Sequence, residues 1–451
     1  MTLLAIEWTN VGIQAGQLIL CLSILVILHE MGHFLPAKWF KCRVEKFYLF
    51  FDPWFSLFKK KIGDTVYGIG WLPLGGYVKI SGMIDESMDK EQMKQPPQPY
   101  EFRSKKPWQR LIIMIGGVTV NLILGFLIFA MILWVWGERK LPVEKLTHGV
   151  SVNPVSEKAG IMNGDKIVSI DGQPVIDFYS LTRDIILDEA KTVQVSRNGE
   201  IKTLAIPKGT IRTLIKSKIQ FVEPRAYCIV DTVFGKFAKF TQDSLQRGDH
   251  IVMLNSTPIT FYDEYRKEKL KYKNQEITLT VLRNQDTVLV KAKADSLGSI
   301  GFYVDEEKLQ GAYTKKFGFF PAFPAGVKKG WETLIMNIKN FKLLFTSDEV
   351  KSSESLGSFL SIGNMFSVHW DWERFWQMTA LLSIVLAFMN ILPIPALDGG
   401  HVLFTLYEII TGRKPGDKFM EYAQMVGMVL LLGIMAYALG LDFWRYLFNK
   451  G

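Results

Sequence analysis

Residues 8–33 read WTNVGIQAGQLILCLSILVILHEMGH, and this stretch sets the class of fold. Its first part, residues 8–28, carries no charge and matches the roughly 20 residues that an α-helix needs to cross a bilayer. A buried helix of a soluble protein would normally show a polar stripe every three to four residues, which this run lacks. The stretch therefore predicts a transmembrane helix that leads directly into two histidines and a glutamate.

Three further runs without charge are long enough to span a membrane, namely residues 111–137, 375–397 and 422–441. The whole chain has 451 residues, of which 48% are hydrophobic and 13% aromatic, and this composition excludes a disordered protein. The predicted fold is a multi-pass α-helical membrane protein with four transmembrane helices.

The residues before the first run indicate whether this run is a cleavable signal peptide. Its only charge is Glu7, so the basic region that begins a cleavable signal peptide is missing, and we expect the first span to stay in the mature protein. The three cysteines, Cys21, Cys42 and Cys228, form no framework of pairs. They exclude a disulfide scaffold and a cysteine-rich zinc module.

The distribution of charge predicts the orientation in the membrane. Residues 38–110 contain 14 Lys or Arg against 8 Asp or Glu, and Arg413, Lys414 and Lys418 lie between the third and fourth runs. Basic loops near spans face the cytoplasm, so we expect both termini to lie outside it. We interpret the net charge of +9 as a signal of this topology and of contact with lipid headgroups. No basic stripe interleaved with aromatics suggests a nucleic-acid partner.

Residues 138–315 should then lie on the outer side, and they contain an internal repeat. Residues 164–175 (GDKIVSIDGQPV) align with residues 248–259 (GDHIVMLNSTPI) at a constant offset of 84. Each copy predicts a turn, a β-branched strand, a second turn with proline, and a helix that begins near Phe178 or Tyr262. Two small α+β domains are therefore expected.

The first copy resembles a bacterial PDZ domain through Gly149, residues 159–161, Gly164-Asp165 and residues 170–172. The resemblance implies capture of extended peptides or C-termini at a strand edge, with a purely structural or gating role as the alternative. The expected domains are residues 1–140 (first membrane half), 141–222 and 223–312 (PDZ-like domains), 313–372 (surface helix and linker) and 373–451 (second membrane half).

The motif His29-Glu30-Met31-Gly32-His33 ends the first charge-free run. On a helix the two histidines lie one turn apart and can hold one Zn²⁺, with Glu30 beside a bound water. A chance or helix-capping pair is the alternative. A catalytic zinc normally has three protein ligands, and Asp398, at the end of the third run, is the candidate for the third. The alternative role for Asp398 is to cap the helix that follows it.

Together these motifs resemble the site-2 protease family of intramembrane zinc metalloproteases, of the bacterial regulator-of-sigma-E protease type with tandem PDZ domains. The resemblance also rests on residues 73–79 (PLGGYVK), 102–105 (FRSK) and 390–400. It implies one zinc per chain held by His29, His33 and Asp398, with Glu30 as the catalytic base. Departures from the family pattern occur at Met31, at Val118 ahead of Asn121, and at residues 355–358.

Residues 66–80 mix aromatic and β-branched residues with glycines, which predicts a membrane-associated β-hairpin. Such a hairpin can clamp an extended substrate by β-augmentation, as the resemblance implies; the alternative is an interfacial hairpin anchored by Trp71 and Tyr77. Asn390 can hold the substrate backbone or bond another helix. The candidate substrate-binding residues are Asn390, Leu74, Gly75, Gly76 and Tyr77.

Residues 319–345 carry apolar positions at helical spacing beside several lysines. This pattern predicts an amphipathic helix on the outer membrane surface, or a helix packed under the PDZ-like pair.

The leading hypothesis is an intramembrane zinc endopeptidase of the bacterial inner membrane, with its active site near the cytoplasmic face. The resemblance implies single-span membrane protein substrates, such as an anti-sigma factor or leftover signal peptides, with the PDZ-like pair gating their access. The alternative is a membrane scaffold or receptor with a structural metal.

Overall fold

The architecture comes from a computed structural model, which describes residues 8–73, 75–83, 96–234, 244–350 and 359–448. The chain forms two compact units. The first comprises residues 1–137, 316–342 and 355–451, and the second comprises residues 138–315 and 343–354.

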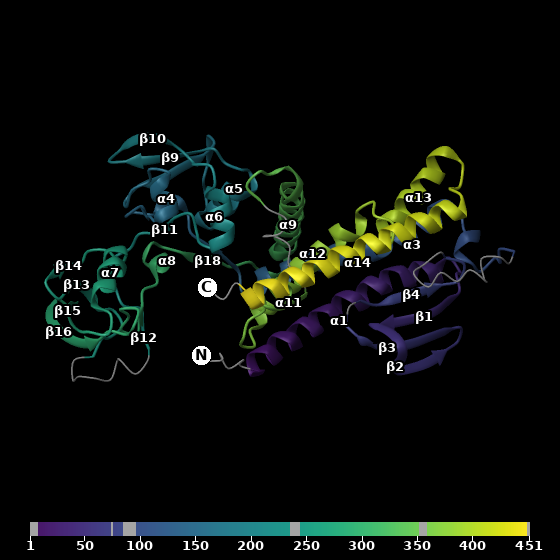
Figure 1. Cartoon of the computed structure of the whole chain (residues 1–451), viewed down its shortest axis with the longest axis horizontal. Helices are drawn as coiled ribbons and strands as arrows, with labels where there is room; N and C mark the ends of the chain where they lie inside the picture. The colour runs from purple at the N-terminus through teal and green to yellow at the C-terminus, as the bar shows by residue number, and fades with distance from the viewer. Residues whose placement is uncertain (1–7, 74, 84–95, 235–243, 351–358, 449–451) are drawn as a thin grey trace. The chain divides into compact units, whose positions relative to one another are not determined.

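Four long helices of the first unit are apolar enough to cross a membrane, by length and composition, as predicted: α1 (Trp8–Trp39), α3 (Pro107–Val135), α12 (Trp372–Ile391) and α14 (Asp417–Phe448) (Figure 1). The third charge-free run is not helical throughout. Its helix ends at Ile391, because Pro393 and Pro395 follow, and a short loop leads to α13 (Asp398–Thr411).

Small residues let α3 approach its neighbours closely. A Cβ added to Gly32 of α1 would lie 2.8 Å from the Cα of Gly117, and one added to Gly125 would lie 2.6 Å from a side-chain carbon of Ile384 on α12. Such contacts are typical of helices that pack within a bilayer, where backbones pack closely at small residues. They fix the end of α1 that carries the histidines against α3.

A four-stranded sheet follows α1, with β1 (Val44–Leu49), β2 (Phe51–Ile62), β3 (Thr65–Leu72) and β4 (Tyr77–Ile80) in the order β2-β3-β1-β4. The predicted hairpin of residues 66–80 is therefore wrong. Its two strands pair with opposite edges of β1, parallel for β3 and antiparallel for β4. The chain between β3 and β4 must pass close to the end of β1 to reach its other edge. Gly76 allows this passage, because a Cβ there would lie 2.6 Å from the carbonyl oxygen of Tyr48.

The first unit also contains η1 (Phe102–Ser104), α11 (Phe359–Gly363) and most of α9 (Phe319–Thr346), whose residues from 343 onward belong to the second unit. The predicted helix over residues 319–345 is present as α9. Within this unit it packs on α3, where Gly330 lies against the ring of Phe126, and its Phe341 contacts Phe388 of α12. Its apolar face is thus partly covered by membrane helices.

The main segment of the second unit, residues 138–315, begins with β5 (Glu138–Lys140) and ends with β18 (Tyr313–Lys315), and these two strands pair with each other. Between them lie two repeats. The first contains η2 (Val143–Lys145), β6 (Val150–Ser151), α4 (Pro154–Lys158), β7 (Lys166–Ile170), β8 (Gln173–Pro174), η3 (Phe178–Ser180), α5 (Leu181–Leu187), β9 (Thr192–Arg197), β10 (Glu200–Ala205), α6 (Thr210–Ser217) and β11 (Glu223–Pro224). The second contains β12 (Thr232–Val233), β13 (His250–Leu254), β14 (Thr257–Pro258), α7 (Tyr262–Glu268), η5 (Lys269–Tyr272), β15 (Glu276–Arg283), β16 (Asp286–Lys293), β17 (Phe302–Tyr303) and α8 (Glu306–Leu309).

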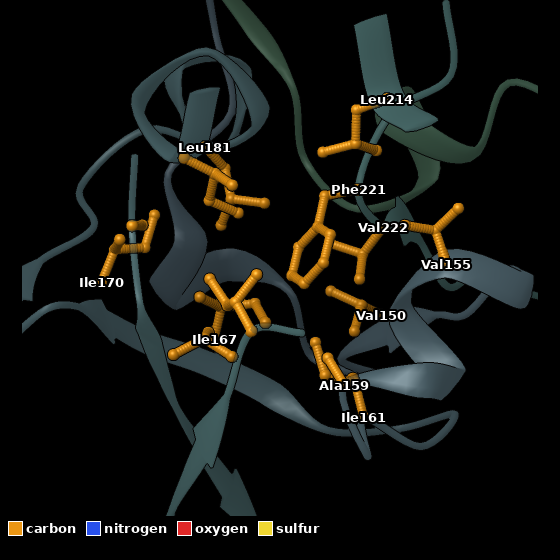
Figure 2. Packing of buried hydrophobic residues seen from close by; sticks show 14 of the residues in the cluster. Val150, Val155, Ala159, Ile161, Ile167, Ile170, Leu181, Leu214, Phe221 and Val222 are labelled. Atoms are coloured by element: carbon orange, nitrogen blue, oxygen red, sulfur yellow. The ribbon is translucent and has the colours of Figure 1, made fainter. Parts of the chain in front are cut away.

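The two repeats have the same architecture. Their main sheets follow the matching orders β10-β9-β7-β8 and β16-β15-β13-β14, and each repeat has an additional two-stranded ladder, β11-β6 or β12-β17. Each also has its own buried cluster. Figure 2 shows the first, in which Phe221, Val222 and Leu214 point toward Leu181 and Ile167. The second cluster contains Tyr265 among its buried residues.

Candidate metal centre

His29 and His33 lie one turn apart on α1, and both are buried. Their Nε2 atoms are 3.3 Å apart, although the two rings stand almost perpendicular. Gly117 of α3 leaves room for them, since a Cβ at that position would lie 2.7 Å from Cε1 of His29. A glycine of the neighbouring helix thus forms one wall of the imidazole pair.

Asp398 reaches the same point from far along the chain. It is the first residue of α13, after the loop that ends α12. Its Oδ2 atom lies 3.3 Å from Nε2 of His29 and 3.3 Å from Nε2 of His33. Gly399 and Gly400 allow the tight entry into α13, because added side chains would collide with the loop backbone at Ile391 and Pro395. The three side chains predicted to bind metal are thus brought together.

This geometry fits a zinc ion. Ligand atoms held about 2.0–2.1 Å from a tetrahedral zinc lie roughly 3.3 Å from each other. All three separations among the two Nε2 atoms and the Asp398 oxygen have this value. That oxygen is also buried and accepts no hydrogen bond from the described part of the chain. Such an atom needs a partner, and a metal ion supplies one.

The far nitrogens of both imidazoles are held by α3. Nδ1 of His33 donates to the carbonyl of Ile113 at 2.8 Å, and Nδ1 of His29 lies 3.1 Å from the side-chain amide of Asn121. Bonds of this kind fix the orientation of metal-binding histidines. Asn121 is fully buried, and Ser383 of α12 donates to its backbone carbonyl.

This orienting role of Asn121 was not predicted from the sequence. The signal that could have found it is a single amide in a long apolar run, since polar side chains inside membrane helices need partners.

Asn390, near the end of α12, lies within hydrogen-bond distance of one of the metal-ligand candidates. Its Nδ2 atom is 3.2 Å from Nε2 of His29, the same nitrogen that faces His33 and Asp398. The amide therefore borders the place where a metal and its water would sit. It bonds across helices in this structure, and its predicted contact with substrate stays a prediction.

A cavity of about 560 Å³ opens beside the three ligand candidates. Glu30, which is buried, lines it next to Gly76, where an added Cβ would lie 3.5 Å from Cγ of Glu30. The remaining predicted substrate residues Gly75, Tyr77 and Asn390 line the same cavity. Leu74 lies outside the described residues, as do residues 355–358.

Comparison with known proteins establishes the family. The sequence model of peptidase family M50 matches residues 17–434. The chain belongs to peptidase family M50. A Neisseria meningitidis protein named "Putative zinc metalloprotease" is 27% identical, with 95% of this chain and 98% of the relative covered. The regulator of sigma-E protease RseP of Escherichia coli is 26% identical over the same shares, and RseP of Salmonella typhimurium is 26% identical over 98% and 100%.

The M50 match confirms the family and the enzyme class that the motifs predicted. The protein is a zinc metalloprotease, and its four apolar helices make it a membrane protein. The family match does not identify the metal ligands of this chain. The support for His29, His33 and Asp398 as ligands is the distance of 3.3 Å between their ligand atoms.

Proposed function

We propose that this M50 metalloprotease is an intramembrane endopeptidase of the bacterial inner membrane that cleaves single-span membrane proteins in or near their transmembrane segment. The observation that carries the proposal is the meeting of His29, His33 and Asp398 at the ends of apolar helices, beside a cavity lined by Glu30. The relatives named regulator of sigma-E protease favour an anti-sigma factor as substrate, and leftover signal peptides are a second substrate class.

His29, His33 and Asp398 would hold the zinc. When bound there, zinc supplies a Lewis acid that activates water and polarises the scissile carbonyl. Glu30 takes the proton from the attacking water and later delivers it to the leaving amine. Asn390 positions the substrate backbone through the donor and acceptor of its amide. The buried setting of these groups strengthens each electrostatic contact.

A transmembrane helix hides its carbonyls in hydrogen bonds, so the substrate must be held extended for cleavage. The free edge of β4 can do this, because it has no strand partner on its outer side among the described residues and its four residues line the cavity. A substrate segment would add as a fifth strand there. Gly76, just before this edge, lies against Glu30, so a segment added there would run beside the proposed base.

The two repeats act as PDZ-like domains that gate access to the protease. A peptide would dock at a strand edge. In the first repeat, the N–H of Phe221, just before β11, already donates to the hydroxyl of Thr182 on α5 at 2.9 Å. The matching position on α7 holds Arg266, which instead reaches Glu223. This difference favours the second repeat as the peptide-binding copy and a structural role for the first.

The test pairs zinc content with cleavage of a tagged single-span substrate, for wild type and Glu30→Gln in detergent. We expect near-stoichiometric zinc in both proteins and cleavage only by wild type. Glu200→Gln, a change of an exposed glutamate in β10, is the control and should cleave normally. Equal cleavage by Glu30→Gln would remove Glu30 from the reaction. Bound zinc without cleavage of several substrates by wild type would favour the scaffold alternative.

A further inference from the structure

One lysine in the cavity lacks an acidic partner among the described residues. Lys46 of β1 is half-buried and lines the cavity that also contains the metal-ligand candidates. Its Nζ atom lies 5.7 Å from the ring centroids of both Tyr48 and Tyr77, and it donates to the Tyr77 hydroxyl at 3.4 Å. Within the described part of the chain, no carboxylate oxygen comes within 4.0 Å of this ammonium.

The neighbouring lysine behaves differently. Lys79 pairs with Lys46 across β1 and β4, so the two side chains share one face of the sheet. Lys79 has an acidic partner, since its Nζ lies 3.6 Å from Glu45, which also accepts from Ser81 at 2.7 Å. Among the described residues, Lys46 reaches a carboxylate through the Tyr77 hydroxyl, which donates to Oδ1 of Asp52 at 2.8 Å, and not by direct contact. The lining therefore carries one ammonium without a direct carboxylate contact, in a cavity that the carboxylates of Glu30 and Asp398 also line.

This charge lies within reach of a substrate held on β4. The edge begins beside Glu30 at Gly76, and strands advance about 3.3 Å per residue, so Lys79 and the paired Lys46 lie roughly 10 Å along the edge. A fifth strand would present alternate side chains to the face that carries both lysines. The residues concerned would be about two to four positions from the cleaved bond.

We propose that Lys46 is a specificity-determining residue that selects substrates with an acidic side chain about two to four residues from the cleaved bond and rejects lysine or arginine there. The inference rests on the proposed endopeptidase function and on substrate addition to β4. The half-buried ammonium lies beside the stacked rings of Tyr48 and Tyr77, whose centroids are 5.3 Å apart, so a carboxylate gains more from pairing with it than at an open surface.

Rejection of lysine and arginine near the cleaved bond would limit which membrane proteins are cleaved. Single-span proteins usually carry lysine and arginine on the cytoplasmic flank of the span. A cavity that repels those residues excludes most membrane proteins, and specificity is commonly achieved by such repulsion. Segments with an acid in this place would be admitted.

The experiment uses the full-length zinc-loaded protein in detergent and tagged single-span substrates that differ at one position. That position is moved along the segment on either side of the cleavage site and holds Asp, Asn or Lys. We expect wild type to show a kcat/KM ratio of Asp to Lys substrates of about tenfold or more at the best position. Lys46→Glu should invert the ratio. Lys59→Glu, which changes an exposed lysine of β2 outside the cavity, should keep the wild-type ratio.

Each outcome decides the matter. Equal cleavage of the three substrates by wild type, or an unchanged ratio in Lys46→Glu, would overturn the inference while leaving the endopeptidase intact. If Lys46→Glu fails to fold, Lys46→Gln must lower the wild-type ratio, and that ratio must itself fall as salt is raised. A zinc-loaded wild type that cleaves none of the substrates would overturn the proposed function, and the inference with it.

Discussion

Buried carboxylates in the two units of this protein differ in how completely their oxygens are hydrogen-bonded. In the second unit, Asp165 is almost fully buried and both of its oxygens are bonded, by Nε and Nη2 of Arg197 at 2.8 and 2.7 Å and by the N–H of Met162 at 2.9 Å. In the first unit, the buried oxygen of Asp398 has two imidazole nitrogens at 3.3 Å and accepts no hydrogen bond from the described residues.

On the proposed metal site, the difference separates a carboxylate that pairs within the fold from one that would bind zinc. A buried charge that is fully paired holds the fold together, and the second repeat duplicates the arrangement, with Asp249 bonded by Arg283 and by the N–H of Gln246. A buried charge left without bonds is expensive unless something absent from the protein chain completes it. If Asp398 binds zinc as proposed, aspartate stabilises the fold in one unit and serves the reaction in the other.

The largest expected effect comes from Asp398→Asn. Asparagine keeps the shape of the side chain but replaces the anionic carboxylate oxygen of the proposed third ligand with a neutral amide, which binds zinc far more weakly. We expect zinc content to fall well below one per chain and kcat/KM to drop roughly 1000-fold or more. Hydrogen exchange of the two repeats should stay at wild-type values. Full zinc occupancy with normal cleavage would show that Asp398 serves only to begin α13.

Asp165→Asn should produce the reverse pattern. It removes the charge that pairs with the partly buried Arg197, which keeps its bond to the carbonyl of Gly160, so we expect the first repeat to lose about 1–3 kcal/mol of stability. Amide exchange of β7 and β9 in the full-length protein is the measurement, and it should accelerate while zinc content stays constant.

Asp249→Asn is the matched variant, and it should accelerate exchange in β13 and β15 of the second repeat alone. Unchanged exchange in both variants would mean that these ion pairs do not hold the repeats together.

Much of this contrast was visible in the sequence. The charge-free runs predicted four spans, the offset of 84 predicted two matching repeats, and the histidine spacing with Asp398 predicted the cluster. These features depend on periodicity and on the cost of polar groups in apolar segments. The match to family M50 confirmed the enzyme class that they implied.

Other features depend on tertiary contacts that no local pattern records. Residues 66–80 carry strand and turn signals in the right places, but nothing in them says that β1 inserts between β3 and β4. Asn121 is one amide among apolar neighbours, and only the packing of α3 on α1 brings it to His29. The loop between α12 and α13 is a different case, because Pro393 and Pro395 indicate the end of the helix locally, although the absence of charge continues through residues 375–397.

Glu306, at the start of α8, falls between the two kinds of carboxylate. Its Oε1 atom is buried and accepts no hydrogen bond among the described residues, and the nearest guanidinium, that of Arg266, lies 3.6 Å away and also pairs with Glu223 at 2.6 Å. Burial, together with the charges of Glu223, Asp263 and Glu307, raises the pKa of Glu306 from 4.5 to about 7, although Arg266 opposes the shift.

The smallest expected effect follows from this pKa. The folded state keeps the Glu306 proton to a higher pH than the unfolded state, so stability is greatest below pH 4.5 for this group and is lost as pH rises toward 7. We expect the opening free energy of β15 amides, measured by hydrogen exchange in the full-length protein, to fall by about 2–3 kcal/mol across that range. Glu306→Gln stays neutral and should flatten the dependence, whereas the exposed control Glu200→Gln should keep it. A dependence that survives in Glu306→Gln would assign the titration to another group, and burial beside Glu223, Asp263 and Glu307 would then not be what makes stability depend on pH.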